Sequence, residues 1–128
     1  PVVVSDDLAA ARDAVRWFPA MVSNHVVDLL RRYDQSHLPP GLTGYLHRRE
    51  FYDYGEHSRE GARHGGFVDD ETCDRFCILG PLEAHLEKLG EMAERGVREF
   101  NIYLMAGNQE ETLAAYGRDV IPRLGARP

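Results

Sequence analysis

The chain has 128 residues, of which 43% are apolar and 28% are charged, so we expect one folded domain over residues 1–128 rather than a disordered chain. Its net charge of −6 argues against binding to a nucleic-acid backbone and against binding to an anionic membrane surface. Two cysteines are too few for a disulfide scaffold, and no apolar run approaches the roughly 18 residues of a membrane span. A cytoplasmic protein is therefore expected.

The first predicted elements are a strand and a helix. "PVVVS" at residues 1–5 is a β-branched run typical of a buried strand, and Ser5 or Asp6 can cap the helix that follows. Pro19 is expected to kink this helix or to start a second one over residues 20–33. The first helix has an apolar stripe at helical spacing, formed by Leu8, Ala11, Val15 and Phe18.

Residues 34–72 form a long excursion without clear periodicity, and they contain four of the six histidines. Connections longer than about 15 residues are uncommon unless they are functional or contain helices of their own. Short helices are therefore expected within residues 47–66, with Gly65 and Gly66 as the stop. A zinc site is not expected here, because the histidines do not form closely spaced ligand pairs.

Residues 75–105 have the clearest pattern of the chain, which reads as strand, helix and strand. "RFCILG" at 75–80 is a second apolar strand, Pro81 suits the first helical position, and Gly96 is a candidate C-terminal cap. "VREFNIYLM" at 97–105 is predicted to be a third strand. A final helix is expected to present Leu113, Tyr116, Val120 and Leu124 on one face, and His25 and His85 are expected at helix surfaces or edges.

Apolar strands joined by a helical segment must run parallel, because antiparallel neighbours need only a short turn. Three successive strand–helix units therefore predict a parallel α/β sheet. Three strands alone would leave both sheet edges open. We interpret the chain as the C-terminal three-eighths of a (β/α)8 TIM barrel, a fold that takes about 250 residues when complete.

Three segments together carry a family resemblance. "DRFCILGPLEAHLEKLGEMAERGVREFNIYLM" followed by "EETLAAYGRDVIPRL" resembles the C-terminal end of luciferase-like flavin-dependent oxidoreductases, and "PVVVSDDLAAARDAVRWF" is similar to their sixth strand and following helix. Within that family the chain looks most like the branch that uses the deazaflavin coenzyme F-420, near the methylenetetrahydromethanopterin reductases. The Gly-Pro after the strand, the Gly-Val before the next strand and "YG…VIP" in the last helix carry the likeness.

The resemblance implies a luciferase-like TIM barrel that binds F-420 or FMN at the carboxyl ends of its strands and transfers hydride to or from a small-molecule substrate. It also implies that most of the cofactor surface belongs to barrel units that precede these residues. Gly80, Pro81 and Tyr103 are the candidate cofactor contacts, since a helix N-terminus after a strand can receive a phosphate and alternation turns Tyr103 toward one face. The alternatives are an unliganded turn at Gly80 and core packing at Tyr103.

His47, Tyr52 and Tyr54 are candidates for a loop over the active site that contacts the substrate or the deazaflavin tail. The alternative is an exposed charged excursion or a dimer contact. Cys73 and Cys77 are expected to be buried structural thiols. The catalytic residues stay unassigned, because no nucleophile motif or acid–base pair is identified.

A function from another class remains open. The chain could be a stand-alone, non-catalytic α/β module that completes its sheet as a homo-oligomer, most simply a dimer. A flavodoxin-like binding domain is a weaker alternative, because that fold needs five strands.

Overall fold

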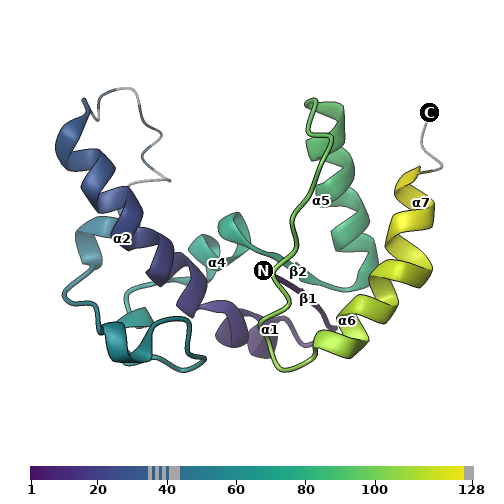
Figure 1. Ribbon diagram of the computed structural model, residues 1–128, viewed down its shortest axis with the longest axis horizontal. Coiled ribbons are helices and arrows are strands. Elements are labelled where there is room, and N and C mark those ends of the chain that lie inside the picture. The colour runs from purple at the N-terminus through teal and green to yellow at the C-terminus, as the bar shows by residue number, and fades with distance from the viewer. Residues whose placement is uncertain (35, 37, 39, 41–43, 126–128) are drawn as a thin grey trace. The chain divides into compact units, whose positions relative to one another are not determined.

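The computed structural model describes residues 1–34, 36, 38, 40 and 44–125 (Figure 1). By its backbone contacts the chain divides into two compact units. Unit 1 comprises Pro1–Arg12 and Cys77–Pro128, and unit 2 comprises Asp13–Phe76. Each unit has a hydrophobic core of its own. None of the helices in the described part of the chain combines the length and apolar character that a membrane span requires.

Unit 1 contains a small parallel sheet. Strand β1 (Val2–Val4) pairs with β2 (Ile78–Gly80), with Val2 opposite Ile78 and Val4 opposite Gly80. Backbone hydrogen bonds extend the pairing at both ends, from the Ile78 N–H to the Pro1 carbonyl (3.1 Å) and from the Ser5 N–H to the Gly80 carbonyl (2.9 Å). The predicted α/β class with parallel pairing is thus confirmed for these two strands.

Helix α5 (Leu82–Glu94) follows β2 directly. Pro81 precedes the first helical residue as its N-cap, one position earlier than expected, with φ −65° and an extended ψ of 163°. The helix ends at Glu94, and Gly96 follows the C-cap residue with a φ of +94°, a backbone conformation that glycine adopts readily. Leu86 and Leu89 are buried in the core against Val2 of β1. The predicted glycine stop of this helix is therefore confirmed.

The predicted third strand is absent, because residues 97–105 run without strand pairing. A strand is defined by its hydrogen-bonded neighbour as well as by its own side chains, and the sheet within the described residues contains only β1 and β2. Several large apolar side chains of this segment are exposed: Val97 (40%), Ile102 (37%), Tyr103 (49%) and Met105 (47%).

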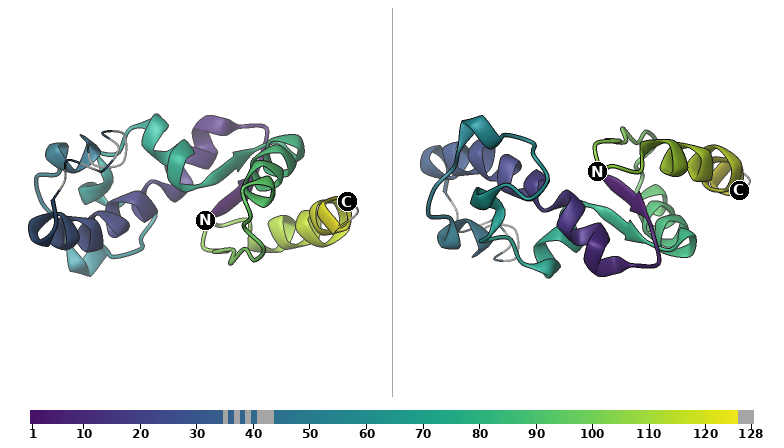
Figure 2. Two further views of the ribbon diagram at one scale, coloured as in Figure 1. Left: turned by 90° about the horizontal axis from the view of Figure 1, so that it is seen from above. Right: turned by 90° about the horizontal axis from the view of Figure 1, so that it is seen from below.

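The C-terminal helical run consists of α6 (Gln109–Ala115), a π-helical turn labelled η5 (Tyr116–Val120), and α7 (Ile121–Gly125). Figure 2 shows this run beside α5, and α5 contacts both η5 and α7. The prediction placed Leu113 on the buried face, but Leu113 is 61% exposed. The π-helical turn has more residues per turn than an α-helix, so buried side chains along this run recur every four residues. The face toward the core accordingly consists of Thr112, Tyr116, Val120 and Leu124.

Two consecutive helices begin the path into unit 2. Helix α1 (Leu8–Val15) starts after a cap in which the Asp7 N–H donates to Ser5 Oγ (3.1 Å) and the Ala10 N–H donates to Asp7 Oδ1 (3.0 Å). Helix α2 (Trp17–Arg32) then begins, with Pro19 in its first turn, where a missing N–H costs little. The sequence predicted the new helix correctly but placed its start three residues too late.

The long excursion contains short helices, as predicted. They are the 3₁₀ turns η2 (Gly44–Arg48), η3 (Tyr54–Glu56) and η4 (Arg63–Gly65), followed by α4 (Asp70–Phe76). The Thr72 N–H donates to Asp69 Oδ1 (2.9 Å), which caps α4. Residues 75 and 76, predicted to open the second strand, therefore belong to a helix. Unit 2 has a core of Leu30, Tyr45 and Leu46 with Phe67 and Phe76 packed against it.

Candidate functional site

The carboxyl ends of β1 and β2 lie together in unit 1, because the strands are parallel and Val4 is opposite Gly80. Gly80 is buried and has a φ of +116°. A Cβ atom at this position would lie 3.4 Å from Cβ of Ala84. Pro81 is exposed beside it. Two of the predicted cofactor contacts thus occupy a strand-to-helix turn that a larger residue than glycine would strain.

The first turn of α5 carries a carboxylate, Glu83, which is paired with a cation of α7. Arg123 of α7 donates from Nη1 to Glu83 Oε1 (2.8 Å) and from Nη2 to Glu83 Oε2 (3.0 Å). This bidentate contact lowers the pKa of Glu83 and raises the pKa of Arg123. An anion that approaches this helix end would meet backbone N–H groups and a guanidinium already engaged by a carboxylate.

Tyr103, the third predicted cofactor contact, lies in the exposed segment 97–105 with 49% of its surface accessible. This exposure does not agree with core packing, and the cofactor contact at Tyr103 stays a prediction.

The core of unit 1 contains a histidine that the sequence reasoning placed at the surface. His85 is fully buried, with Nδ1 2.8 Å from the Tyr116 hydroxyl and Nε2 3.1 Å from the Val3 carbonyl. Burial lowers the pKa of His85 and raises the pKa of Tyr116. The expectation for His85 was wrong because this position adjoins Leu86 at the edge of the apolar stripe, a signal that a helical projection could have revealed.

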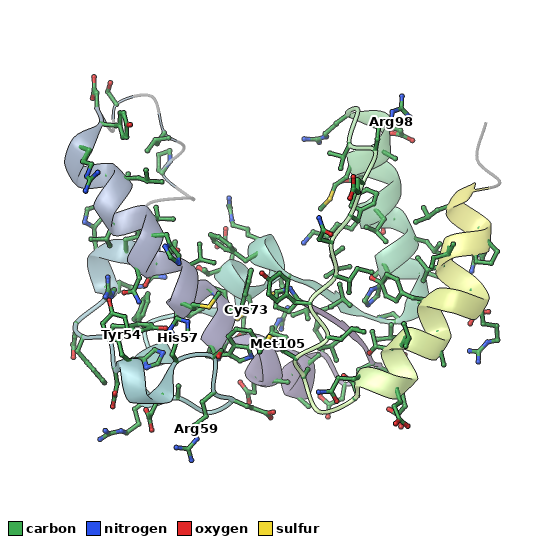
Figure 3. The ribbon with its side chains drawn as sticks, in the orientation of Figure 1. Tyr54, His57, Arg59, Cys73, Arg98 and Met105 are labelled. Carbon is green, nitrogen blue, oxygen red and sulfur yellow. The ribbon has the colours of Figure 1, made fainter. Side chains whose placement is uncertain are left out.

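The excursion in unit 2 brings two predicted residues together in what we call the aromatic cluster, formed by Tyr52, Tyr54, His57 and His64. The Tyr52 hydroxyl lies 2.6 Å from His57 Nδ1, and the Tyr52 and Tyr54 rings meet edge to face at 5.1 Å. The His64 ring lies 4.1 Å from the Tyr52 ring between centroids. Figure 3 shows Tyr54 and His57 next to each other, which agrees with their stacked rings.

Tyr52 is the centre of the aromatic cluster. The Arg49 guanidinium lies 5.5 Å from its ring centroid, in cation–π geometry, and also donates to Asn24 Oδ1 of α2. Burial raises the pKa of Tyr52, and Tyr54 adds to the shift. The phenol is therefore a proton donor at neutral pH, with the imidazole of His57 as its neighbour. His47, the other predicted loop residue, is exposed on η2 and is not a member of the cluster.

His64 differs from the other members because it is only 1% exposed, and neither of its ring nitrogens has a hydrogen-bond partner. Burial lowers the pKa of His64 most, and the carboxylates of Glu56 and Asp53 oppose this, whereas His57 and Arg49 reinforce it. The neutral imidazole therefore offers one N–H donor and one nitrogen acceptor without protein partners.

A pocket of about 270 Å³ adjoins His64 within unit 2. Sequence reasoning proposed none of its wall residues as ligand contacts, since they come from two stretches about 12 residues apart. It is lined by Arg48, Glu50, Phe51, Arg63, His64, Gly66 and Phe67.

Within the described ranges, no group of three or more His, Cys, Asp or Glu side chains is arranged to hold a metal ion. Cys73 and Cys77 are both buried, as the sequence predicted.

Comparison with known families gives one result. The sequence model of a family described as luciferase-like monooxygenase matches residues 1–99. The matched range includes β1, β2, α5 and the whole of unit 2, and it ends inside the unpaired segment 97–105. Searches of curated proteins and of solved structures found no match.

Proposed function

Since the chain belongs to the luciferase-like monooxygenase family, we propose that it forms the C-terminal part of an oxidoreductase that transfers hydride to or from coenzyme F-420 or FMN. The match over residues 1–99 is the observation that carries this proposal. The family resemblance of the last helix, residues 110–124, adds to it from outside the matched range.

The proposed architecture is the last three-eighths of a (β/α)8 barrel. The parallel pairing of β1 with β2 and the helix that follows β2 support it. The exposed apolar side chains of residues 97–105 also support it, since a barrel strand needs neighbours on both edges and this segment is paired with none. We expect this segment to become a paired strand when the preceding barrel units are present.

The cofactor would lie at the carboxyl ends of the strands, as ligands do in TIM barrels. The turn at Gly80 and Pro81 fits this position, because glycine leaves room for a close backbone approach. A flavin or deazaflavin supplies the hydride chemistry when bound, and this chain would contribute only part of its binding surface. Tyr103, at the far end of the neighbouring segment, is the third proposed contact.

The excursion, residues 34–72, would contribute to binding of the substrate. Tyr52 and Tyr54 are already packed against each other and against His57, so they offer a preformed aromatic surface with a phenol and an imidazole in contact. We propose that this surface, together with His47 on η2, contacts the small-molecule substrate or the deazaflavin tail. Long loops on rigid barrels commonly carry such specificity.

The test is a binding titration on the protein that includes the preceding barrel units. F-420 and FMN are titrated separately, and quenching of cofactor fluorescence is followed. We expect saturable binding of one of the two, weakened by Gly80→Ala and unchanged by Gly107→Ala, whose added Cβ has no neighbour within 4 Å. Circular dichroism of each variant checks that the fold is retained. Saturable binding of neither cofactor would contradict the proposal.

The alternative is a non-catalytic module that assembles as a homo-oligomer. The exposed apolar residues of segment 97–105 favour it as well, because an oligomer could cover them. Sedimentation of residues 1–128 separates the two functions. A discrete dimer that binds neither F-420 nor FMN would favour the module, whereas cofactor binding that requires the preceding units would favour the oxidoreductase.

A further inference from the structure

We propose that the pocket beside His64, in unit 2, binds a small monocarboxylate that has an apolar or aromatic body. This inference concerns a ligand site of the excursion itself. It goes beyond the proposed hydride transfer, and it does not require a flavin or deazaflavin to be bound.

The first observation is the unmet hydrogen-bonding capacity of His64. Its imidazole is 1% exposed, and both ring nitrogens lack partners. Buried polar groups in folded proteins are almost always hydrogen-bonded, so an imidazole with two unpaired nitrogens at a pocket wall indicates a missing partner. Each nitrogen has less than 1 Å² of accessible surface, so a carboxylate oxygen in the pocket would accept the N–H of His64 once the ring or a neighbouring wall side chain turns.

The second observation is the pair of guanidinium groups in the pocket wall. Arg48 is held in place, since its Nη2 donates to Asp69 Oδ2 (2.7 Å) and its Nε donates to the Phe67 carbonyl (3.4 Å). Arg63 is held loosely, with its nearest carboxylate oxygens 3.9 Å away on Glu56 and 4.0 Å away on Asp53. Arg63 therefore has donors left for a planar, two-oxygen acceptor.

The remaining wall residues decide between classes of anion. Phe51 and Phe67 provide apolar surface, and Phe51 is 48% exposed. Glu50 also lines the pocket, and its negative charge disfavours a dianion such as phosphate more than a monoanion. The volume of about 270 Å³ is near the lower end of small-molecule pockets. A compact monocarboxylate matches these walls better than a phosphate or a nucleotide.

The experiment uses the full protein labelled with ¹⁵N-histidine, with benzoate as the probe. Benzamide is the uncharged control of the same shape, and inorganic phosphate is the competing anion. Affinities are measured by calorimetry, and the imidazole resonances of His64 are followed by NMR. We expect saturable benzoate binding that shifts the His64 resonances, with benzamide and phosphate each at least about tenfold weaker.

Two arginine variants distinguish benzoate binding in the pocket from attraction to positively charged side chains elsewhere on the surface. Arg63→Gln should weaken benzoate binding about tenfold or more, because it removes a charge-assisted donor. Arg59→Gln is the matched control and should change the affinity less than about twofold. Arg59 is an exposed arginine that is ion-paired to the same Glu56 and points outward from the excursion (Figure 3).

His64→Phe should abolish binding, and His64→Gln, which keeps an N–H donor, should retain part of it. If His64→Phe does not fold, His64→Gln and Arg63→Gln decide the question. The proposal is overturned if benzoate does not bind or shifts no His64 resonance. It is also overturned if phosphate binds more tightly than benzoate, or if Arg59→Gln weakens binding as much as Arg63→Gln. The cofactor titration does not depend on these outcomes, so the failure of one proposal is distinguishable from the failure of the other.

Discussion

His64 and His85 are both buried imidazoles, but they differ in their hydrogen bonds. His85 is satisfied by a phenol and a backbone carbonyl, whereas His64 has neither nitrogen paired. Burial lowers the pKa of each below its ordinary value of 6.5. The folded protein therefore holds both rings neutral at a pH where the unfolded chain already binds protons.

The lowered pKa of both histidines in the fold predicts how the free energy of unfolding depends on pH. At these two histidines the unfolded state binds more protons than the folded state below about pH 6.5, so their contribution to the free energy of unfolding should be constant above that pH and fall as the pH decreases through 6.5. Each histidine can contribute at most about 1.4 kcal/mol per pH unit. Urea denaturation at several pH values measures the slope.

The variants His64→Gln and His85→Gln should each remove part of that slope, since glutamine does not titrate. A wild-type protein whose unfolding free energy is unchanged between about pH 7 and pH 5.5 would show that the two rings are not neutral in the fold.

The Tyr116 hydroxyl is the partner that satisfies His85 in the core of unit 1. Tyr116→Phe keeps the ring but leaves His85 Nδ1 buried without a partner, so we expect a loss of about 1–3 kcal/mol in the free energy of unfolding. Tyr33→Phe is the control, because Tyr33 is 68% exposed. Equal effects of the two substitutions in urea denaturation would argue against the buried hydrogen bond.

Single residues with local roles could be read from the sequence, and those with tertiary roles could not. Gly96 was correctly expected at the end of α5, because this role depends on neighbouring backbone groups. The cap of the first helix was expected at Ser5 or Asp6, but Asp7 makes it, and Ser5 Oγ only accepts the Asp7 N–H. His85 and His64 are defined by residues 31 or more positions away or by a pocket, and no local pattern marks such partners.

At the scale of the element, the turn from β2 to α5 depends on one glycine. Gly80→Ala would place a side chain at a φ of +116° and against Ala84, so we expect a destabilisation of about 1–3 kcal/mol. Gly107→Ala adds a Cβ in open space, and its effect should stay within about 0.5 kcal/mol. Thermal unfolding followed by circular dichroism compares the two, and a tolerated Gly80→Ala would contradict the proposed constraint.

Elements whose partners lie within the chain were predictable, and the others were not. The strand at 1–5 and the strand ending at Gly80 pair with each other through backbone hydrogen bonds, so their apolar pattern was enough to predict both strands. Residues 97–105 have the same kind of pattern and no paired neighbour, so the pattern alone was misleading. The side chain of Leu113 was misplaced for another reason, since a regular helical period does not anticipate a π-helical turn.

At the scale of the whole molecule, the two units have separate cores, and this predicts two responses to one substitution. Trp17, the only tryptophan, is buried in unit 2, while Tyr116 and His85 are buried in unit 1. Gly80→Ala should lower the urea midpoint of the Tyr116 and His85 resonances more than the midpoint of Trp17 fluorescence. Equal shifts of both midpoints would mean that the units unfold as one cooperative structure.

The parallel α/β class and the family could be predicted from the sequence, because the strand–helix units and the Gly-Pro turn stand in the order that the family has. The closure of a barrel was not, because the described residues pair only two strands and closure depends on pairing all the way round.

The π-helical turn at Tyr116–Val120 has a consequence for how this region tolerates changes in length. Such a turn behaves like one residue inserted into an ordinary α-helix. Deleting Gly117, which is exposed, would convert the run to regular helix, and the core residues Thr112, Tyr116, Val120 and Leu124 would then be spaced by four, three and four residues. These spacings keep Val120 and Leu124 on the core face, and Arg123 stays on the side of Glu83. In evolutionary terms, the turn absorbs one inserted residue, and homologues without it should keep the same apolar face in a helix that is one residue shorter.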